Sequence, residues 1–223
     1  MAFLNPQDAR LVSEQFAEHL QRDVKLVVAV GGDDCMYCNE VQALCEELAG
    51  FSDRLSTETV DINSPTALAL KLDKSPAIAV LAAGNGDAPD TDYGIRFYGI
   101  PSGYEFMSLL DAIHTVGSDR VSLQPETLEF LQNLEQDLHI QVFVTPTCPH
   151  CPRAVMLAHH LAYASPRVTA DMVESMEFPD LAAQYNVYGV PRTVINESVH
   201  QEGAAPEPMI LAKLRQAVAV PAA

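Results

Sequence analysis

The stretch Ile140-Gln-Val-Phe-Val-Thr-Pro-Thr-Cys-Pro-His-Cys-Pro-Arg153 decides how the second half of this 223-residue chain folds. The apolar run 140–144 is typical of a buried strand, and a helix is predicted over 154–164. Two cysteines three positions apart at a helix start share one side of its first turn, within disulfide reach. The free N–H groups and the dipole at that end favour a thiolate on the first cysteine. The spacing therefore predicts a redox site at Cys148 and Cys151.

The same plan occurs earlier in the chain. Residues 26–38 contain an apolar run, a turn and the motif Cys35-Met-Tyr-Cys38, and a helix is predicted after it. In each half a proline precedes a further apolar run. Pro76 follows the second cysteine of its motif by 38 residues, and Pro191 follows the second cysteine of the other motif by 40. Three landmarks in matching order indicate a duplicated domain.

We predict one unit over residues 1–117 and a second over residues 118–223. Each half is close to the usual size of a domain and long enough to bury its own core. After an initial helix, the predicted order in each half is strand, helix, strand, helix, strand, strand, helix. This order places the chain in the α/β class.

The composition excludes some classes of partner. The net charge is −17, from 30 acidic and 13 basic residues. Such a surface disfavours nucleic acid and anionic membranes. No run approaches the roughly 18 apolar residues of a membrane span. The first ten residues lack the basic and apolar regions of a secretory signal, so we expect a cytoplasmic protein.

Four of the five cysteines belong to the two CxxC pairs, and Cys45 remains. Cys45 lies on an apolar helix face, which favours a small buried side chain over a reactive thiol. CxxC pairs also occur in zinc sites, where the pairs are usually roughly 15–20 residues apart. Here 110 positions separate Cys38 from Cys148. A structural zinc protein and a redox-inactive binding module stay as the alternatives to an enzyme, and we expect no bound metal.

The two motifs resemble those of the thioredoxin superfamily. The tandem arrangement is similar to that of the two-unit protein disulfide oxidoreductases, also called glutaredoxin-like proteins. The resemblance extends over essentially the whole chain and includes Phe97-Tyr-Gly-Ile-Pro-Ser-Gly-Tyr-Glu-Phe106 and Tyr188-Gly-Val-Pro-Arg192. It implies two fused thioredoxin-like units, each a central mixed four-stranded sheet flanked by helices. It also implies dithiol–disulfide exchange with protein substrates and no cofactor.

The resemblance also assigns roles to individual residues. It implies a cis proline beside each site, which corresponds to Pro76 and Pro191; a proline cannot donate a hydrogen bond and fixes a tight turn near the sulfurs. For the exchange, we expect an exposed Cys148 to attack as a thiolate and the more buried Cys151 to resolve the mixed disulfide. In the first unit we expect Cys35 to attack and Cys38 to resolve in the same way.

This chain departs from the superfamily pattern at two kinds of position. It has no tryptophan. Thioredoxin buries an acid six positions before its first cysteine, where this chain has Ala29 and Val142. A similar tandem pair forms the N-terminal part of alkyl hydroperoxide reductase flavoprotein subunits. No Gly-x-Gly-x-x-Gly fingerprint occurs here, so a flavin module is not expected in this chain.

We expect the two redox sites to differ in acidity. Asp33 and Asp34 directly precede Cys35 and disfavour its thiolate. His150, together with Arg153, brings positive charge to the other motif and is interpreted as a tuning group. We therefore predict the lower pKa for Cys148.

Other aromatic and histidine positions have less definite interpretations. Tyr37 either covers the sulfurs or packs against its loop. The apolar loop 97–106 serves either unit packing or peptide binding. His159 and His160 are interpreted as solvated surface. As partners, the resemblance implies a thioredoxin reductase-like flavoenzyme as electron donor, and a peroxiredoxin or misoxidised proteins as acceptors.

Overall fold

The computed structural model describes residues 3–32, 35–86 and 88–219. The chain separates into two compact units. The first contains Met1–Asp92, Tyr98–Ile100 and Ile113–Arg120, and the second contains Tyr93–Phe97, Pro101–Ala112 and Val121–Ala223. The single boundary between residues 117 and 118 stays a prediction.

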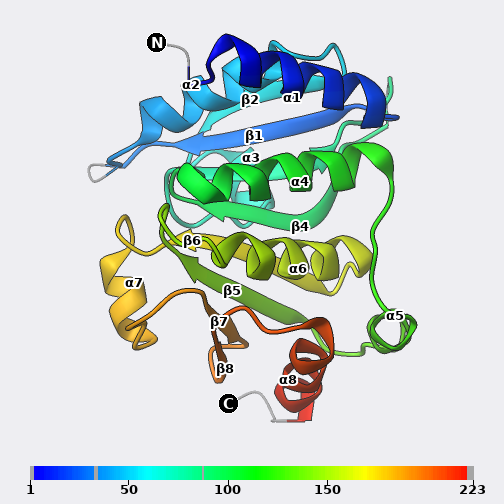
Figure 1. Cartoon of the computed structure of the whole chain (residues 1–223), viewed down its shortest axis with the longest axis vertical. Coiled ribbons are helices and arrows are strands. Elements are labelled where there is room, and N and C mark those ends of the chain that lie inside the picture. Colours follow the sequence, from blue (N-terminus) through cyan, green and yellow to red (C-terminus); the bar gives the residue numbers. More distant parts are fainter. Residues whose placement is uncertain (1–2, 33–34, 87, 220–223) are drawn as a thin grey trace. The chain divides into compact units, whose positions relative to one another are not determined.

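The first unit holds a helix at its start and three strands connected through two further helices (Figure 1). Its elements are α1 (Pro6–His19), β1 (Val24–Val30), α2 (Cys38–Ala49), β2 (Leu55–Asp61), α3 (Pro65–Ala69) and β3 (Ala77–Ala82). Strand β4 (Thr91–Tyr98) and helix α4 (Phe106–Ser118) each contribute residues to both units.

Strand β1 pairs in parallel with β2 and antiparallel with β3. Val30 lies opposite Asp61, so the loop that follows β1 and the turn that follows β2 leave the same edge of the sheet. Ala29 lies opposite Ala77. Pro76, one residue before β3, is therefore level with Val30, directly before the loop that carries the first cysteine pair.

The first unit is organised around one wholly buried strand, β3. Every residue of β3 is buried. Helix α2 contacts β1 and β2 and buries Val41, Leu44, Cys45 and Leu48, a spacing that puts them on one helix face (Figure 1). The prediction that Cys45 is a buried apolar position is confirmed, and burial raises the pKa of its thiol.

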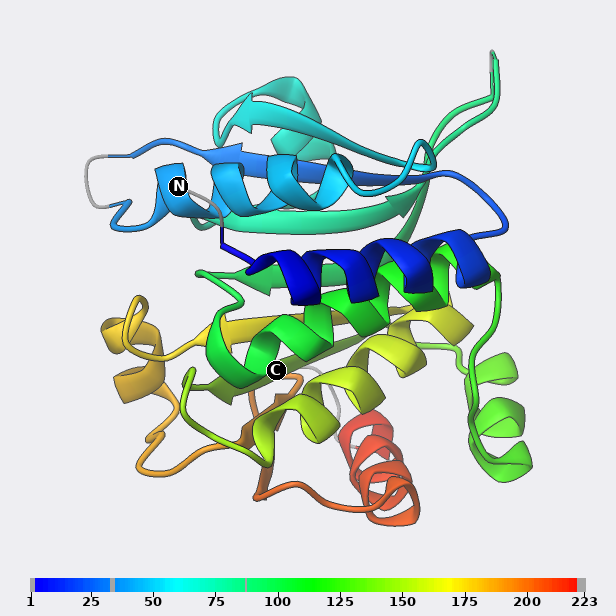
Figure 2. The same cartoon turned by 45° about the horizontal axis from the view of Figure 1, so that its top comes forward.

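The second unit repeats the plan. It contains a one-turn 3-10 helix, η1 (Gly103–Glu105), and the elements α5 (Pro125–Gln132), β5 (Leu138–Val144), α6 (Cys151–Ala164), β6 (Val168–Glu174), α7 (Pro179–Gln184), β7 (Arg192–Ile195), β8 (Val199–Glu202) and α8 (Glu207–Ala219). The four strands from β5 onward lie in the order β6-β5-β7-β8, with β6 parallel and β7 antiparallel to β5. Figure 2 shows α6 along β5 and β6, which it contacts.

The register of this mixed sheet repeats that of the first unit. Val144, the last residue of β5, lies opposite Glu174, the last residue of β6. Phe143 lies opposite Arg192. Pro191 is therefore level with Val144, at the edge from which the loop with the second cysteine pair leaves. Within the described residues, we find no helix with the length and apolar character needed to cross a bilayer.

Candidate functional site: two disulfides at helix starts

The first pair, Cys35 and Cys38, forms a disulfide with 5.6 Å between the Cα atoms. Helix α2 begins at Cys38, and both cysteines are only partly buried. Tyr37 is the residue before the helix, and its carbonyl accepts the Val41 N–H at 2.9 Å. The Tyr37 residue is 36 % exposed, and the two interpretations of its ring stay predictions. The predicted influence of Asp33 and Asp34 lies outside the described residues.

Gly31 connects this disulfide to the proline segment. Its N–H donates to Cys38 Sγ at 3.4 Å, and its carbonyl accepts a hydrogen bond from the Ser75 hydroxyl. Ser75 precedes Pro76 through a cis peptide bond. The hydrogen bonds of one glycine therefore hold the second sulfur and the cis proline segment at the same place in the first unit.

The second pair, Cys148 and Cys151, forms a disulfide with 5.5 Å between the Cα atoms. Helix α6 begins at Cys151, and the Cys148 N–H donates to the Thr145 carbonyl at 3.1 Å. Cys148 is only 8 % exposed, so the prediction of an exposed first cysteine is wrong for this oxidised form. The loop that carries Cys148 turns at Thr145 and is contacted by η1 through the hydrogen bond from the Tyr104 N–H to the Pro146 carbonyl, so Cys148 lies in a packed part of the unit. Cys151 is fully buried, so Cys148 remains the more accessible of the two.

Both prolines follow cis peptide bonds, Ser75–Pro76 and Val190–Pro191, as the resemblance implied. The sheet registers place each one level with the start of a cysteine loop. Their catalytic role, and that of His150, stays a prediction. His150 is exposed directly before α6. Arg153 donates to the Ala204 carbonyl at 3.0 Å.

Glu105 is a buried acid beside the second pair that sequence reasoning missed. It is 1 % exposed on η1, which contacts α6. The neighbouring Tyr104 N–H donates to the carbonyl of Pro146, two residues before Cys148, at 3.0 Å. Burial raises the pKa of Glu105 to about 7, although a hydrogen bond from Ser108 lowers it. One signal was available: Glu105 is the one acidic residue in the apolar stretch 97–106.

A second buried acid, Glu174, ends β6 at the same edge. Its Oε2 accepts the N–H groups of Met176 and Glu177 at 2.9 and 2.7 Å. Burial raises its pKa against these two hydrogen bonds. The corresponding position in the first unit is Asp61, which is exposed. In the second unit two buried acids therefore lie on elements that adjoin the cysteine loop, whereas Asp61, the counterpart of Glu174 in the first unit, is open to water.

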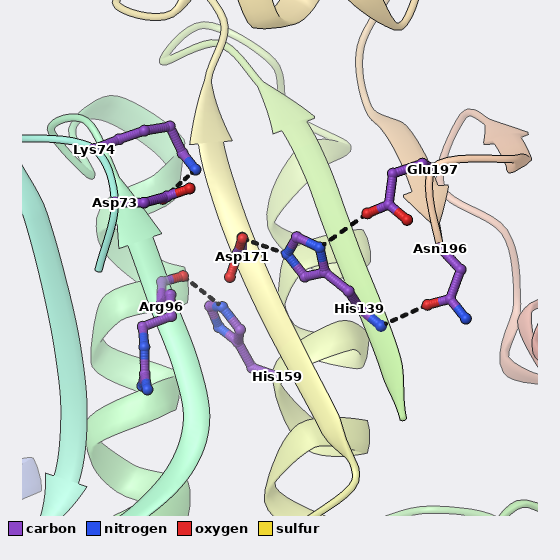
Figure 3. Close-up of polar contacts among 8 residues, drawn as sticks. All are labelled: Asp73, Lys74, Arg96, His139, His159, Asp171, Asn196 and Glu197. Carbon is purple, nitrogen blue, oxygen red and sulfur yellow. Dashed lines mark hydrogen bonds and ion pairs between the residues drawn. The ribbon is translucent and has the colours of Figure 1, made fainter. Parts of the chain in front are cut away.

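Two histidines of helix α6 lie deeper than the sequence suggested. His159 is 1 % exposed and donates from Nε2 to the Arg96 carbonyl at 3.1 Å (Figure 3). Its ring also packs against Phe97. Burial lowers its pKa to about 4. His160 is half-buried and pairs with Asp111 at 2.9 Å. The interpretation of both as solvated surface is wrong, because position 159 lies on the buried face of α6.

His139 on β5 lies between two carboxylates (Figure 3). Its Nε2 is 2.6 Å from Asp171 Oδ2, and its Nδ1 is 3.3 Å from Glu197 Oε1. Burial lowers the pKa of His139, but the two acids outweigh it and the net direction is upward. His139 is the second residue of β5, near the end opposite to the cysteine loop, so this group stabilises the sheet rather than the redox site.

The sequence and the structure of this chain are similar to those of known proteins. Residues 138–216 match a family model described as a thioredoxin domain. The alkyl hydroperoxide reductase protein AhpF of Enterococcus faecalis superposes with a TM-score of 0.84 at 29 % identity, over 96 % of this chain and 100 % of that one. Residues 138–216 therefore match the thioredoxin family, and the chain is similar over nearly its whole length to thioredoxin-superfamily proteins with two CxxC motifs. Its predicted α/β fold of thioredoxin-like units with two CxxC motifs is confirmed.

Two further proteins with a similar sequence or structure are informative. A protein disulfide oxidoreductase from Aeropyrum pernix has a TM-score of 0.86 at 27 % identity, over 97 % of this chain and 94 % of that one. An alkyl hydroperoxide reductase protein from Staphylococcus aureus is 27 % identical over 207 residues, 93 % of this chain and 37 % of that protein. The chain thus spans a little over a third of the length of such curated relatives.

Each pair of cysteines is joined within its own motif, which leaves no thiolate among the four to bind zinc in this oxidised form. Among the residues that the structure describes, three or more histidine, cysteine or acidic side chains nowhere gather as a metal site would require. The arrangement instead suits two-electron exchange, since a disulfide at a helix start can open to a stabilised thiolate.

Proposed function

We propose that this chain is a thiol–disulfide oxidoreductase that exchanges disulfides with protein substrates through both CxxC pairs. The observation that carries this proposal is the repeated geometry. In each unit a disulfide lies at the start of a helix, and a cis proline lies level with the strand end before it. A helix start favours a thiolate, and an accessible thiolate beside a second cysteine is what exchange requires.

The exchange at the second pair proceeds in two displacements. The Cys148 thiolate attacks one sulfur of the partner's disulfide, a mixed disulfide forms, and the partner's other sulfur leaves as a thiolate that takes a proton. The Cys151 thiolate then attacks the sulfur of Cys148 in the mixed disulfide. This attack releases the partner's sulfur that was bonded to Cys148. Two electrons pass to the partner, and the Cys148–Cys151 disulfide forms. The reverse sequence oxidises a partner dithiol.

The exposure of the two cysteine residues supports these roles. Cys148 is 8 % exposed and Cys151 is fully buried, so a partner meets Cys148 first. In the first unit, Cys35 attacks and Cys38 resolves. The Gly31 N–H that faces Cys38 Sγ stabilises this sulfur when it carries charge.

Glu105 supplies proton transfer to the second pair. A fully buried Cys151 cannot exchange its proton directly with water, and Glu105 is a buried acid on an element that contacts α6. Its pKa near 7 suits an acid that gains and loses a proton at neutral pH. It takes the place of the acid that is absent at Val142.

The partners follow from the chemistry and the resemblance. The acceptor is a protein disulfide, with a peroxiredoxin as the specific candidate. The donor is a thioredoxin reductase-like flavoenzyme. The similarity to alkyl hydroperoxide reductase proteins supports a peroxide-related acceptor. We place the protein in the cytoplasm, where thiols are kept reduced and dithiol exchange is continuous.

Insulin reduction by dithiothreitol tests the proposal. We compare the unaltered chain with a Cys35→Ser/Cys38→Ser variant, a Cys148→Ser/Cys151→Ser variant and the combination of all four changes, with Cys45→Ser as control. Each one-centre variant should retain part of the rate, and the combined variant should show the uncatalysed rate. An unaltered chain without activity would favour a binding module. Stoichiometric zinc bound by the paired cysteines would favour the metal-site alternative.

A further inference from the structure

Ser108 contacts the acid of the second redox centre. It is fully buried in the first turn of α4, three residues after Glu105. Its hydroxyl donates to Glu105 Oε2 at 2.6 Å. Residues three apart share one side of a helical turn, so the chain itself sets this contact.

Ser108 has no described competitor for this carboxylate. Glu105 Oε1 is buried and has no hydrogen-bond partner among the described residues. A buried carboxylate loses its hydration, and a donor aimed at it favours the charged form. Ser108 therefore opposes burial, which by itself would keep Glu105 protonated at neutral pH.

The elements packed against η1 carry few titratable groups that could act instead. In the loop after β5 and along α6 these groups are Cys148, His150, Cys151, Arg153, His159 and His160. The two cysteines are joined as a disulfide. His150 is exposed, and each of the others has its own partner away from Glu105.

We propose that Ser108 is a positioning residue of the second redox centre: its hydroxyl fixes the Glu105 carboxylate and sets the pH at which this acid takes up the proton of Cys151. The inference rests on the proton transfer assigned to Glu105 above.

The proton balance is simple. When the centre is oxidised, Glu105 accepts the Cys151 proton as that sulfur attacks Cys148, and passes it to the partner's sulfur, which leaves as a thiolate. When the centre is reduced, the same proton returns to Cys151. Ser108 keeps its own proton throughout and donates more strongly to the charged carboxylate than to the neutral acid.

The test uses the Cys35→Ser/Cys38→Ser chain, in which the second pair is the single CxxC centre. The rate of disulfide formation with hydroxyethyl disulfide is measured against pH. In parallel, the carboxyl C=O infrared band that is absent in Glu105→Gln is titrated. Ser108→Ala should move the midpoint of both profiles upward by about 1 pH unit, the size expected for losing one hydrogen bond to a charged group.

Matched variants separate the hydroxyl from packing. Ser108→Thr keeps the hydroxyl and should keep the original midpoint, whereas Ser108→Val, which has the same shape as threonine, should shift it as alanine does. The comparison of Ser108→Thr with Ser108→Val also tests the proposal if Ser108→Ala folds poorly. Thr127→Val is the control, because Thr127 is buried in the same unit and its hydroxyl has no partner among the described residues.

The outcomes separate the two levels of the proposal. An unchanged midpoint in both Ser108→Ala and Ser108→Val overturns the role of Ser108, even where Glu105→Gln removes the step at the infrared midpoint. The ionisation of Cys148 gives its own step in every variant, at the midpoint that labelling of Cys148 measures. A second step that remains at the infrared midpoint of Glu105 in the Glu105→Gln variant overturns the role of Glu105 and that of Ser108 together. An equal shift of the midpoint in Thr127→Val would mean that the loss of any buried hydroxyl in this unit has the same effect. That result would also overturn the proposal.

Discussion

Gly103 lies against the backbone carbonyl of Pro146: a Cβ at this glycine would be 2.2 Å from the carbonyl oxygen. The same oxygen accepts the Tyr104 N–H at 3.0 Å. Gly103 also has a φ of +60°, a backbone angle that residues other than glycine rarely adopt. The element that carries Glu105 can therefore meet the loop that carries Cys148 because residue 103 has no side chain.

Gly103→Ala should damage both stability and the second centre. We expect a loss of about 2–3 kcal/mol in the free energy of unfolding, because the methyl group forces η1 away from backbone that cannot yield. Gly203→Ala is the matched control: its φ is +71°, but no atom lies within 4 Å of a Cβ there. Urea unfolding measures both. Equal losses in the two variants would show that the contact with Pro146 is not tight.

Glu105→Gln should stabilise the protein at alkaline pH. The pKa of Glu105 is raised from 4.5 to about 7, so the fold favours the protonated form. The associated stability is present below the unfolded pKa and is lost as pH rises through about 7. At pH 8 the free energy of unfolding of the glutamine variant should exceed that of the unaltered chain by about 2–3 kcal/mol. At pH 4, where Glu105 is protonated, the two free energies of unfolding should be similar.

Urea unfolding at the two pH values checks this, with Glu135→Gln at an exposed position as control. A Glu105→Gln variant that is less stable at pH 8 would mean that the carboxylate is well paired. The gain in stability would accompany slower exchange at the second pair, because glutamine cannot accept the proton of Cys151. An acid that costs stability is typical of a functional position.

His139 gives stability that depends on pH in a defined direction. Its pKa is raised by Asp171 and Glu197 against the effect of burial. Stability from this group is therefore fully present below the unfolded pKa of roughly 6.5 and is lost as pH rises through the higher folded value. His139→Gln should flatten this part of the stability profile, and Glu197→Gln should flatten it less. A profile that is identical in His139→Gln contradicts the pairing.

Much of the redox geometry could be predicted from the sequence. The spacing of each CxxC pair, its place between strand and helix, and the matching prolines all depend on local order, and the structure has two disulfides and two cis prolines at these positions. The fold class followed from the repeat. The sequence also placed Cys45 inside, because its neighbours at helical spacing are apolar.

Other features depended on contacts between distant segments. Glu105 lies 43 residues before Cys148, and only the close approach of Gly103 to Pro146 brings it to the site. The burial of Cys148 depends on how its loop turns, which residue types do not determine. His159 was misread for a different reason. It lies four residues after the buried Val155 and on the same face of α6, but its polarity suggested solvent.

The two attacking cysteines should differ in acidity. Cys148 has no adjacent acid in the sequence and is followed by His150, so we predict that its pKa is lower than that of Cys35. After reduction, iodoacetamide labelling against pH is followed by mass spectrometry for each cysteine. The midpoint should be lower for Cys148, even though its smaller exposed surface reduces its maximal rate. An equal or lower midpoint for Cys35 rules out this order.

Trapping of the mixed disulfide tests the exchange most directly. Reduced Cys38→Ser and Cys151→Ser variants are mixed with a disulfide-containing protein and analysed by non-reducing mass spectrometry, beside Cys35→Ser and Cys148→Ser. Because the resolving sulfur is missing, the first two variants should accumulate a covalent complex through Cys35 and Cys148, respectively, at the altered centre. The other two should form none there. A complex through Cys38 or Cys151, or no complex in any variant, would contradict the account.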